Sequence, residues 1–212
     1  AGCANDETYE LSHRLCKFAE MDRVFFSDSG STAVEVAMKI AWQFHINARN
    51  PEKAKFVSFK NSYHGDTTGA MSLADLSGGM HKKFEKILLE NISLNLPKTA
   101  KDLEKFDQFL EKNKNKIAGI FVEPLVQCAG GMKFYDPKIL SEIFRISKKH
   151  QIIFIADECA VGFYRTGKKF AFNHAKIKPD ILILGKALTG GTMTLAATLV
   201  KKDIFNKFSG NT

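Results

Sequence analysis

Ile181-Leu182-Ile183-Leu184-Gly185-Lys186-Ala187-Leu188-Thr189-Gly190-Gly191 reads as a buried strand that runs into a lysine and a glycine-rich loop. The four apolar residues favour β-structure, and Gly185 would allow a sharp turn after them. Lys186 would then stand at the end of the strand. A lysine is costly to bury unless it is paired or reactive, although an ordinary surface lysine is the commoner case at such a position. Other parts of the sequence are needed to distinguish a reactive lysine from an ordinary surface lysine.

The composition is that of an ordinary globular protein. The 212 residues are 44% hydrophobic and 25% charged, which is enough to build a substantial core. No apolar run approaches the roughly 18 residues that a membrane-spanning helix needs. Residues 1–15 have neither the basic flank nor the apolar core of an export signal. We therefore expect a soluble, cytoplasmic protein that makes no contact with a membrane.

The cysteines predict no metal site, and the charge pattern predicts no nucleic-acid site. Cys3, Cys16, Cys128 and Cys159 are scattered, with no C-x-x-C pair and no histidine at metal-ligand spacing, so free thiols are expected. The net charge of +8 comes largely from lysines spread through helical segments such as residues 101–116. Because no basic stripe interleaved with aromatic residues occurs, we expect no nucleic-acid partner.

Strand and helix patterns alternate along most of the chain. Strands are predicted at residues 23–27, 55–60, 117–122, 152–156, 181–184 and 194–200, and helices at 7–20, 31–44, 102–114, 137–149 and 170–175. This alternation predicts an α/β fold with a mostly parallel central sheet and helices on both faces. Ligands of such sheets bind beyond the carboxyl ends of the strands. Residues 75–97 are irregular and are interpreted as a surface insertion without an assigned role.

A candidate anion site follows the strand predicted at residues 23–27. The polar turn around Gly30 and Ser31 leads into an apolar helical pattern, and Thr32 and Glu35 have the spacing of a capping box, so the helix should begin near Ser31. The first turn of a helix offers free backbone N–H groups and the positive end of the helix dipole. A phosphate would suit this place, although the motif taken alone is better explained as an ordinary capped helix.

Two further strands are followed by residues that could face a ligand. The strand at 55–60 runs into a polar loop in which Tyr63 could lie flat on a planar ring. His64, next to it, is by itself more typical of a structural hydrogen-bonding residue than of a catalyst. The strand at 117–122 ends at Glu123.

Adjacent carboxylates, Asp157 and Glu158, follow the strand predicted at 152–156. Neighbouring side chains of an extended chain point to opposite faces, so only one of the two can face a given ligand. Combined with the anion site, Tyr63 and Lys186, that carboxylate suits a ligand with a phosphate, a flat ring, a ring nitrogen and a carbonyl. Pyridoxal 5′-phosphate has all four groups, and a lysine can hold its aldehyde as a Schiff base.

Five runs of the chain resemble a known family. They are DSGSTAVEVAMK (28–39), YHGDTTGAMS (63–72), EPLVQCAGGM (123–132), IADECAVGFYRTG (155–167) and PDILILGKALTGG (179–191). In this order they are similar to class III pyridoxal-phosphate aminotransferases of fold type I. The resemblance implies that Lys186 forms the Schiff base and that Asp157 pairs with the pyridine nitrogen. It also implies that Gly30 and Ser31 bind the phosphate, and that Tyr63 lies against the ring and near the substrate.

Three other residues of these runs have less definite roles. Glu123 and Glu158 are weaker candidates, either for support of the cofactor on the side of its ring hydroxyl or for ordinary ion pairs. Arg165 is interpreted as a structural anchor of its loop. No residue is expected to bind a metal.

The run KALTGGTMTLAATL (186–199) is similar to the branch of the family that serves biotin synthesis. This implies transfer of an amino group from S-adenosylmethionine to 8-amino-7-oxononanoate by a homodimer. Another class III aminotransferase, of the ω-amino acid or acetylornithine type, and a non-catalytic remnant remain open. Family members are longer, with an additional N-terminal segment and a C-terminal small domain, so residues 1–212 are expected to form an incomplete large domain that binds the cofactor.

Overall fold

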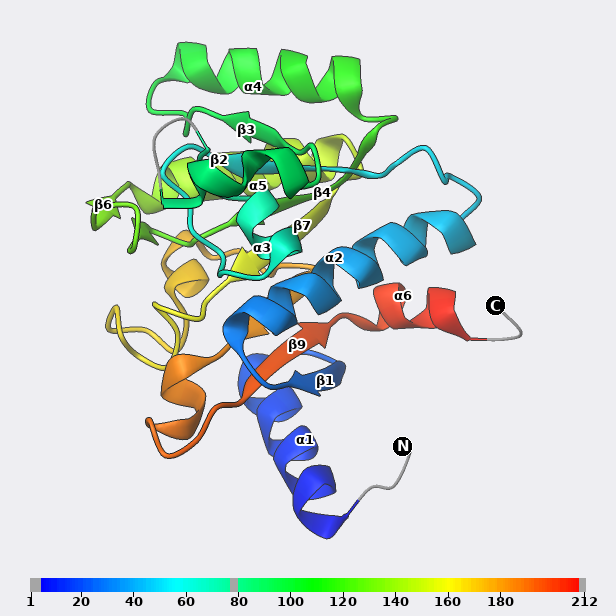
Figure 1. Ribbon diagram of the computed structural model, residues 1–212, viewed down its shortest axis with the longest axis vertical. Helices are drawn as coiled ribbons and strands as arrows, with labels where there is room; N and C mark the ends of the chain where they lie inside the picture. The colour runs from blue at the N-terminus through cyan, green and yellow to red at the C-terminus, as the bar shows by residue number, and fades with distance from the viewer. Residues whose placement is uncertain (1–4, 77–79, 210–212) are drawn as a thin grey trace.

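The computed structural model describes residues 5–76 and 80–209, and its centre is a seven-stranded sheet (Figure 1). The strands lie in the order β1-β9-β8-β7-β4-β2-β3. They are β1 (Arg23–Ser27), β9 (Ala196–Val200), β8 (Ile181–Leu184), β7 (Ile153–Asp157), β4 (Ile117–Val122), β2 (Lys55–Phe59) and β3 (Ile92–Leu94). Strand β9 runs antiparallel to both its neighbours, and every other neighbouring pair in this sheet is parallel. The predicted α/β fold with a mostly parallel sheet is therefore confirmed.

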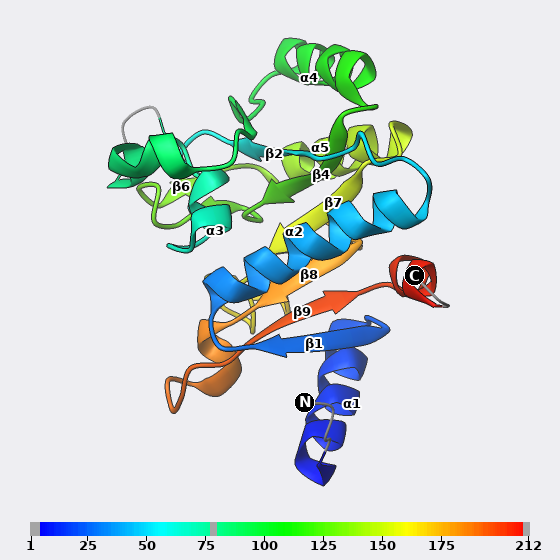
Figure 2. The same ribbon diagram turned by 45° about the vertical axis from the view of Figure 1, so that its right-hand side comes forward.

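Helices cover both faces of the sheet, as the two views show (Figure 1, Figure 2). On one face lie α2 (Gly30–Asn47), α3 (Thr68–Ser72) and α6 (Lys202–Phe205), and on the other lie α1 (Asp6–Ala19), α4 (Ala100–Asn113) and α5 (Pro137–Lys149). The side chains of strand β8 show why both faces of the sheet are covered. Ile181 and Ile183 pack in the core under α2, whereas Leu182 and Leu184 pack in the core under α5. Because alternate side chains enter opposite cores, a strand covered on both faces is apolar throughout.

Helix α2 begins at Gly30 with a different cap from the predicted one. Ser29 is the N-cap residue: its Oγ accepts the Thr32 N–H at 3.3 Å, and its own N–H donates to Thr32 Oγ1 at 2.9 Å. Glu35 instead accepts the N–H of Gly69 at 2.7 Å. The predicted Thr32–Glu35 capping box was wrong, because the Glu35 carboxylate joins α2 to α3.

The segment 75–97 contains two elements that the sequence did not reveal. These are the 3-10 helix η1 (Met80–Ile87) and the edge strand β3, which pairs in parallel with β2. The interpretation of the whole segment as an irregular insertion was therefore wrong. Strand β3 was missed because three residues are too few to show the alternation of a strand. Gly78 and Gly79, also in this segment, and Cys3 lie outside the described residues.

The remaining predicted elements are confirmed within a few residues at their ends. Pro137 occupies the first turn of α5, where Asp136 is the N-cap residue and its Oδ1 accepts the N–H of Lys138 at 2.7 Å. A short hairpin of β5 (Val126–Gln127) and β6 (Lys133–Phe134) follows β4. Within the described ranges, every helix is too short or too polar to cross a bilayer.

Candidate functional site

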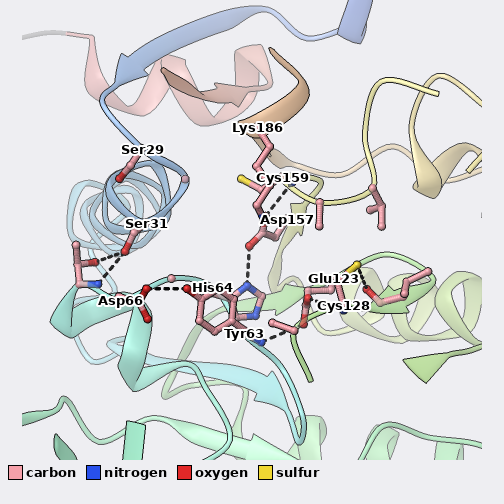
Figure 3. A pocket seen from close by; sticks show the side chains of 17 residues that line it. Ser29, Ser31, Tyr63, His64, Asp66, Glu123, Cys128, Asp157, Cys159 and Lys186 are labelled. Carbon is pink, nitrogen blue, oxygen red and sulfur yellow. Dashed lines mark hydrogen bonds and ion pairs between the residues drawn. The ribbon is translucent and has the colours of Figure 1, made fainter. Parts of the chain in front are cut away.

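A cavity of about 550 Å³ lies at the carboxyl ends of the parallel strands, beside the first turn of α2 (Figure 3). Its walls come from the loops at residues 29–31, 63–67, 123–129 and 157–161 and from Lys186. The lining includes all five residues predicted for the site: Gly30, Ser31, Tyr63, Asp157 and Lys186. A volume of this size is typical of sites for small ligands and cofactors. The structure therefore brings together residues that are up to 156 positions apart in the chain, from Gly30 to Lys186.

The start of α2 forms one wall of the cavity. Ser31 Oγ accepts the N–H of Thr67 at 2.8 Å and donates to Thr67 Oγ1 at 2.8 Å. Gly65 has a φ of +126°, and a Cβ atom there would lie 2.5 Å from the Ser31 side chain, so only glycine lets the two loops approach this closely. With the Ser31 hydroxyl engaged by Thr67, an anion at this wall would be bound mainly by first-turn backbone N–H groups and the helix dipole.

Asp157 is held by two hydrogen bonds. Its Oδ1 accepts the N–H of Cys159 at 3.1 Å, and its Oδ2 accepts from His64 Nδ1 at 2.8 Å. Burial alone would lower the pKa of His64, but the hydrogen bond to Asp157 and the charges of Asp157 and Glu123 raise it above its ordinary value. The hydrogen bond from His64 also fixes the orientation of the Asp157 carboxylate.

His64 matters more to the site than its sequence context indicated. Its side chain is wholly buried, and its Nε2 atom has no hydrogen-bond partner among the residues that the structure describes. The only sequence signal was its place beside Tyr63, after a strand. Its role depends on the side chain of Asp157, which no local pattern could reveal.

Glu123 holds the loop that carries Tyr63. Its Oε2 accepts the N–H of Tyr63 at 3.1 Å, and its Oε1 accepts the N–H of Cys128 at 3.3 Å. Burial raises the pKa of Glu123 to about 7, although the charge of His64 opposes this rise. The carboxyl group can therefore gain or lose a proton near neutral pH while it remains tied to the backbone.

Glu158 lies away from the cavity. Its carboxylate accepts the N–H groups of Ala171 at 2.9 Å and Phe172 at 2.8 Å, at the start of the 3-10 helix η2 (Ala171–Ala175). Burial raises its pKa to about 8. Across the described ranges Glu158 has no ion-pair partner, and it does not line the cavity. It anchors η2 rather than serving either role that was predicted for it.

Tyr63 lines the cavity with a protonated phenol. Its OH donates to Asp66 Oδ2 at 2.8 Å. Burial, together with the hydrogen bond and charge of Asp66, raises the pKa of Tyr63 to about 12. The phenol therefore keeps its proton at neutral pH.

Lys186 opens the 3-10 helix η3 (Lys186–Thr189), with an exposed side chain at the cavity (Figure 3). The predicted turn at Gly185 is wrong, because Gly185 is extended with a φ of −167° and Lys186 itself takes the left-handed conformation with a φ of 44°. Gly185 serves a different need. A Cβ atom there would lie 3.2 Å from Cys159 Sγ, so the missing side chain permits close packing beneath the lysine.

Arg165 does not anchor its loop through its side chain, which is exposed and has no hydrogen bond or ion pair within residues 5–76 and 80–209. The loop is held by its backbone, for example by the Tyr164 N–H, which donates to the Lys169 carbonyl at 3.1 Å.

Comparison with known proteins supports what this geometry indicates. Residues 1–212 match the family model described as aminotransferase class III. The chain belongs to the class III aminotransferase family. The structural neighbours agree with the fold, and the predicted family is confirmed.

Two relatives show which members of the family the chain is similar to. It is 43% identical, over 99% of its length, to the adenosylmethionine-8-amino-7-oxononanoate aminotransferase of Buchnera aphidicola subsp. Schizaphis graminum. It is 38% identical, over 98% of its length, to the protein of the same name from Staphylococcus aureus. The chain spans about half the length of these curated relatives, 50% and 49% respectively.

Two solved structures superpose closely on the chain. The adenosylmethionine-8-amino-7-oxononanoate aminotransferase of Methanocaldococcus jannaschii matches with a TM-score of 0.91 at 34% identity, over 99% of this chain and 49% of that one. An amine transaminase from an uncultivated Pseudomonas species, solved in its PLP-bound form, matches with a TM-score of 0.91 at 31% identity. This second match covers 98% of this chain and 50% of the transaminase.

Proposed function

We propose that this chain is the large, cofactor-binding domain of an aminotransferase that uses pyridoxal 5′-phosphate and acts in biotin synthesis. The reaction would transfer an amino group from S-adenosylmethionine to 8-amino-7-oxononanoate. One observation carries the proposal: Lys186, Asp157 and the first turn of α2 line a single cavity. The choice of reaction is supported by relatives at 38 to 43% identity whose names state it.

The residues of the cavity fit this cofactor. The first turn of α2 provides a seat for a phosphate at Gly30 and Ser31. Asp157 is a carboxylate kept beside a buried histidine, which suits pairing with a protonated ring nitrogen. Lys186 has an exposed amine at the opening of the same cavity. These groups match the phosphate, the ring nitrogen and the aldehyde of the cofactor.

Each residue then has a definite task. Lys186 would hold the cofactor covalently and, once free, its amine would act as the general base that moves a proton from the substrate α-carbon to a carbon atom of the cofactor. The bound cofactor supplies an electron sink for the carbanion that this proton loss leaves. Asp157 would pair with the ring nitrogen, and the hydrogen bond from His64 would hold the Asp157 carboxylate in place. Tyr63 supports a ring face, and Gly30 and Ser31 hold the phosphate.

A second candidate function is another class III aminotransferase. The amine transaminase from the Pseudomonas species superposes with the same TM-score, 0.91, as the M. jannaschii protein, and its identity of 31% is close to 34%. The fold of this domain is therefore equally compatible with a different amino donor. A domain without activity of its own is the further alternative, and its cofactor band would persist with either amino donor.

The proposal extends to the setting of the enzyme. We infer a homodimer in the cytoplasm with small-molecule substrates and without a nucleic-acid or membrane partner. Light scattering of the purified protein, with and without cofactor, tests the dimer. A mass equal to one chain of the full-length protein would overturn this part of the proposal.

The cofactor test uses absorbance in the visible range after pyridoxal 5′-phosphate is added. The wild-type chain should gain a band that survives gel filtration, Lys186→Ala should lack it, and Lys112→Ala, at an exposed lysine of α4, should keep it. A band retained by Lys186→Ala would overturn the assignment of the lysine. Two amino donors then distinguish the two reactions. If S-adenosylmethionine removes the band and a simple primary amine such as phenylethylamine does not, the result favours the biotin-pathway reaction over that of an amine transaminase.

A further inference from the structure

The 3-10 helix η1 places His81 against the ring of Tyr63. This helix lies in the segment 75–97, to which no role was assigned from the sequence. The two rings stack with centroids 5.6 Å apart and planes inclined by 23°. The His81 side chain is only 5% exposed. It does not line the cavity, whereas Tyr63 does. His81 therefore supports the tyrosine without reaching the space where a cofactor or substrate would lie.

The same histidine is also bonded to Asp66. His81 Nε2 lies 2.8 Å from Asp66 Oδ1, and the Tyr63 OH lies 2.8 Å from Asp66 Oδ2. Because an ionised carboxylate only accepts hydrogen bonds, both partners donate to it. The three side chains thus form a closed triangle, in which each group contacts the other two.

This triangle restrains a carboxylate that would otherwise be mobile. The Asp66 side chain is 69% exposed, and it lines the cavity. An exposed carboxylate normally samples several rotamers and gains little from one neighbour. Here one oxygen is held by the phenol of the cavity wall and the other by a buried imidazole, so both its position and its orientation are set.

We propose that His81 is a positioning residue that fixes the Tyr63 ring and the Asp66 carboxylate at the cavity wall. It acts through these two residues and touches no reacting group. This inference rests on the proposed function only in so far as Tyr63 lies against the cofactor. The triangle itself is a property of the protein without cofactor, so it can be tested separately.

Two substitutions separate the hydrogen bond from the packing. His81→Phe keeps an aromatic ring against Tyr63 and removes the donor to Asp66. His81→Gln keeps an N–H donor at a similar distance along the side chain and removes the ring. If His81 only filled space, His81→Phe would behave like the wild-type protein.

The first readout is the titration of the Asp66 carboxyl group, followed by its ¹³C chemical shift and assigned with Asp66→Asn. The hydrogen bonds from His81 and then Tyr63 hold the pKa of Asp66 below its usual value. The midpoint should move to higher pH in His81→Phe and stay low in His81→Gln. An unchanged midpoint in His81→Phe would overturn the proposal.

The second readout is the affinity for pyridoxal 5′-phosphate, measured by titrating the visible band. Loss of the stacking on Tyr63 or of the hydrogen bond to Asp66 should weaken cofactor binding by about two- to tenfold, the range expected for one aromatic contact or one hydrogen bond. Affinity equal to that of the wild type in both variants would contradict a positioning role. If no band forms in the wild-type protein the proposed function fails, but the Asp66 titration still decides the role of His81.

Circular dichroism and thermal unfolding establish that each variant is folded. Should His81→Phe not fold, His81→Asn takes its place, because its shorter side chain does not reach Asp66. The same upward movement of the Asp66 midpoint is expected there, and an unmoved midpoint would again contradict the proposal.

Discussion

His64 Nδ1 lies 2.8 Å from Asp157 Oδ2, although the two residues are 93 positions apart in the chain. Both side chains are almost completely buried. A buried pair of this kind fixes the orientation of its carboxylate, and removal of one partner leaves a charge that is poorly compensated. The pair thus links the end of β7 to the loop after β2, and both residues line the cavity.

Asp157→Asn should leave cofactor binding to Lys186 intact and slow the removal of the substrate α-proton by about a hundredfold or more, because the ring nitrogen loses its charged partner. Single-turnover kinetics with an amino donor, in the full-length protein, measure this rate. Asp203→Asn, at an exposed position of α6, is the matched control and should react like the wild type. Rates for Asp157→Asn equal to those of the control would refute the role given to Asp157.

Glu158 should make the folded protein less stable as the pH rises. Its pKa is about 8 when folded, against a usual value of 4.5, so the folded state binds the proton more tightly than the unfolded state. The stabilisation is complete below about pH 4.5 and is lost as the pH rises through 8, with a slope of at most about 1.4 kcal/mol per pH unit.

Urea unfolding at pH 5.5 and pH 7.5 tests this dependence. The decrease in the free energy of unfolding between the two pH values should be smaller in Glu158→Gln than in the wild type. The exposed Glu10→Gln should retain the wild-type decrease. The same decrease in both variants would show that burial of Glu158 does not raise its pKa.

Gly65→Ala should destabilise the protein by more than about 3 kcal/mol, through the cost of a positive φ together with a clash with Ser31. Gly167 is a matched control, since its φ is +89° but, apart from its chain neighbours, no described residue has a heavy atom within 4 Å of the place that a Cβ atom would take there. Gly167→Ala should cost only about 1 to 2 kcal/mol, the contribution of backbone strain. Equal losses in urea unfolding would exclude a steric role for Ser31.

Gly185→Ala should cost about 1 to 3 kcal/mol because its methyl group would press on Cys159 Sγ. The cost should fall when Cys159 is also changed to Ala. A double-mutant cycle measured by urea unfolding should therefore give a coupling of about 0.5 kcal/mol or more between the two positions. Strictly additive effects would mean that the glycine is required for some other reason.

The strands, most helices and the candidate site residues could be predicted because each has a local signal. The run 181–184 is apolar at every position, as a strand covered on both faces must be, and Lys186 follows it directly. Parallel strands end at one edge of the sheet, so residues that follow several such strands meet there. The fold class and the grouping of Gly30, Ser31, Tyr63, Asp157 and Lys186 at one cavity follow from these two facts.

The partners of these residues were decided by the tertiary structure. Nothing near His64 in the chain indicates Asp157, nothing near Glu35 indicates the N–H of Gly69, and nothing near Gly185 indicates the sulfur of Cys159. Edge strand β3 was also missed, because its three residues carry too short a pattern. Local periodicity indicates which face of an element is buried. Hydrogen bonds and close contacts between distant segments depend instead on which strands are neighbours in the sheet.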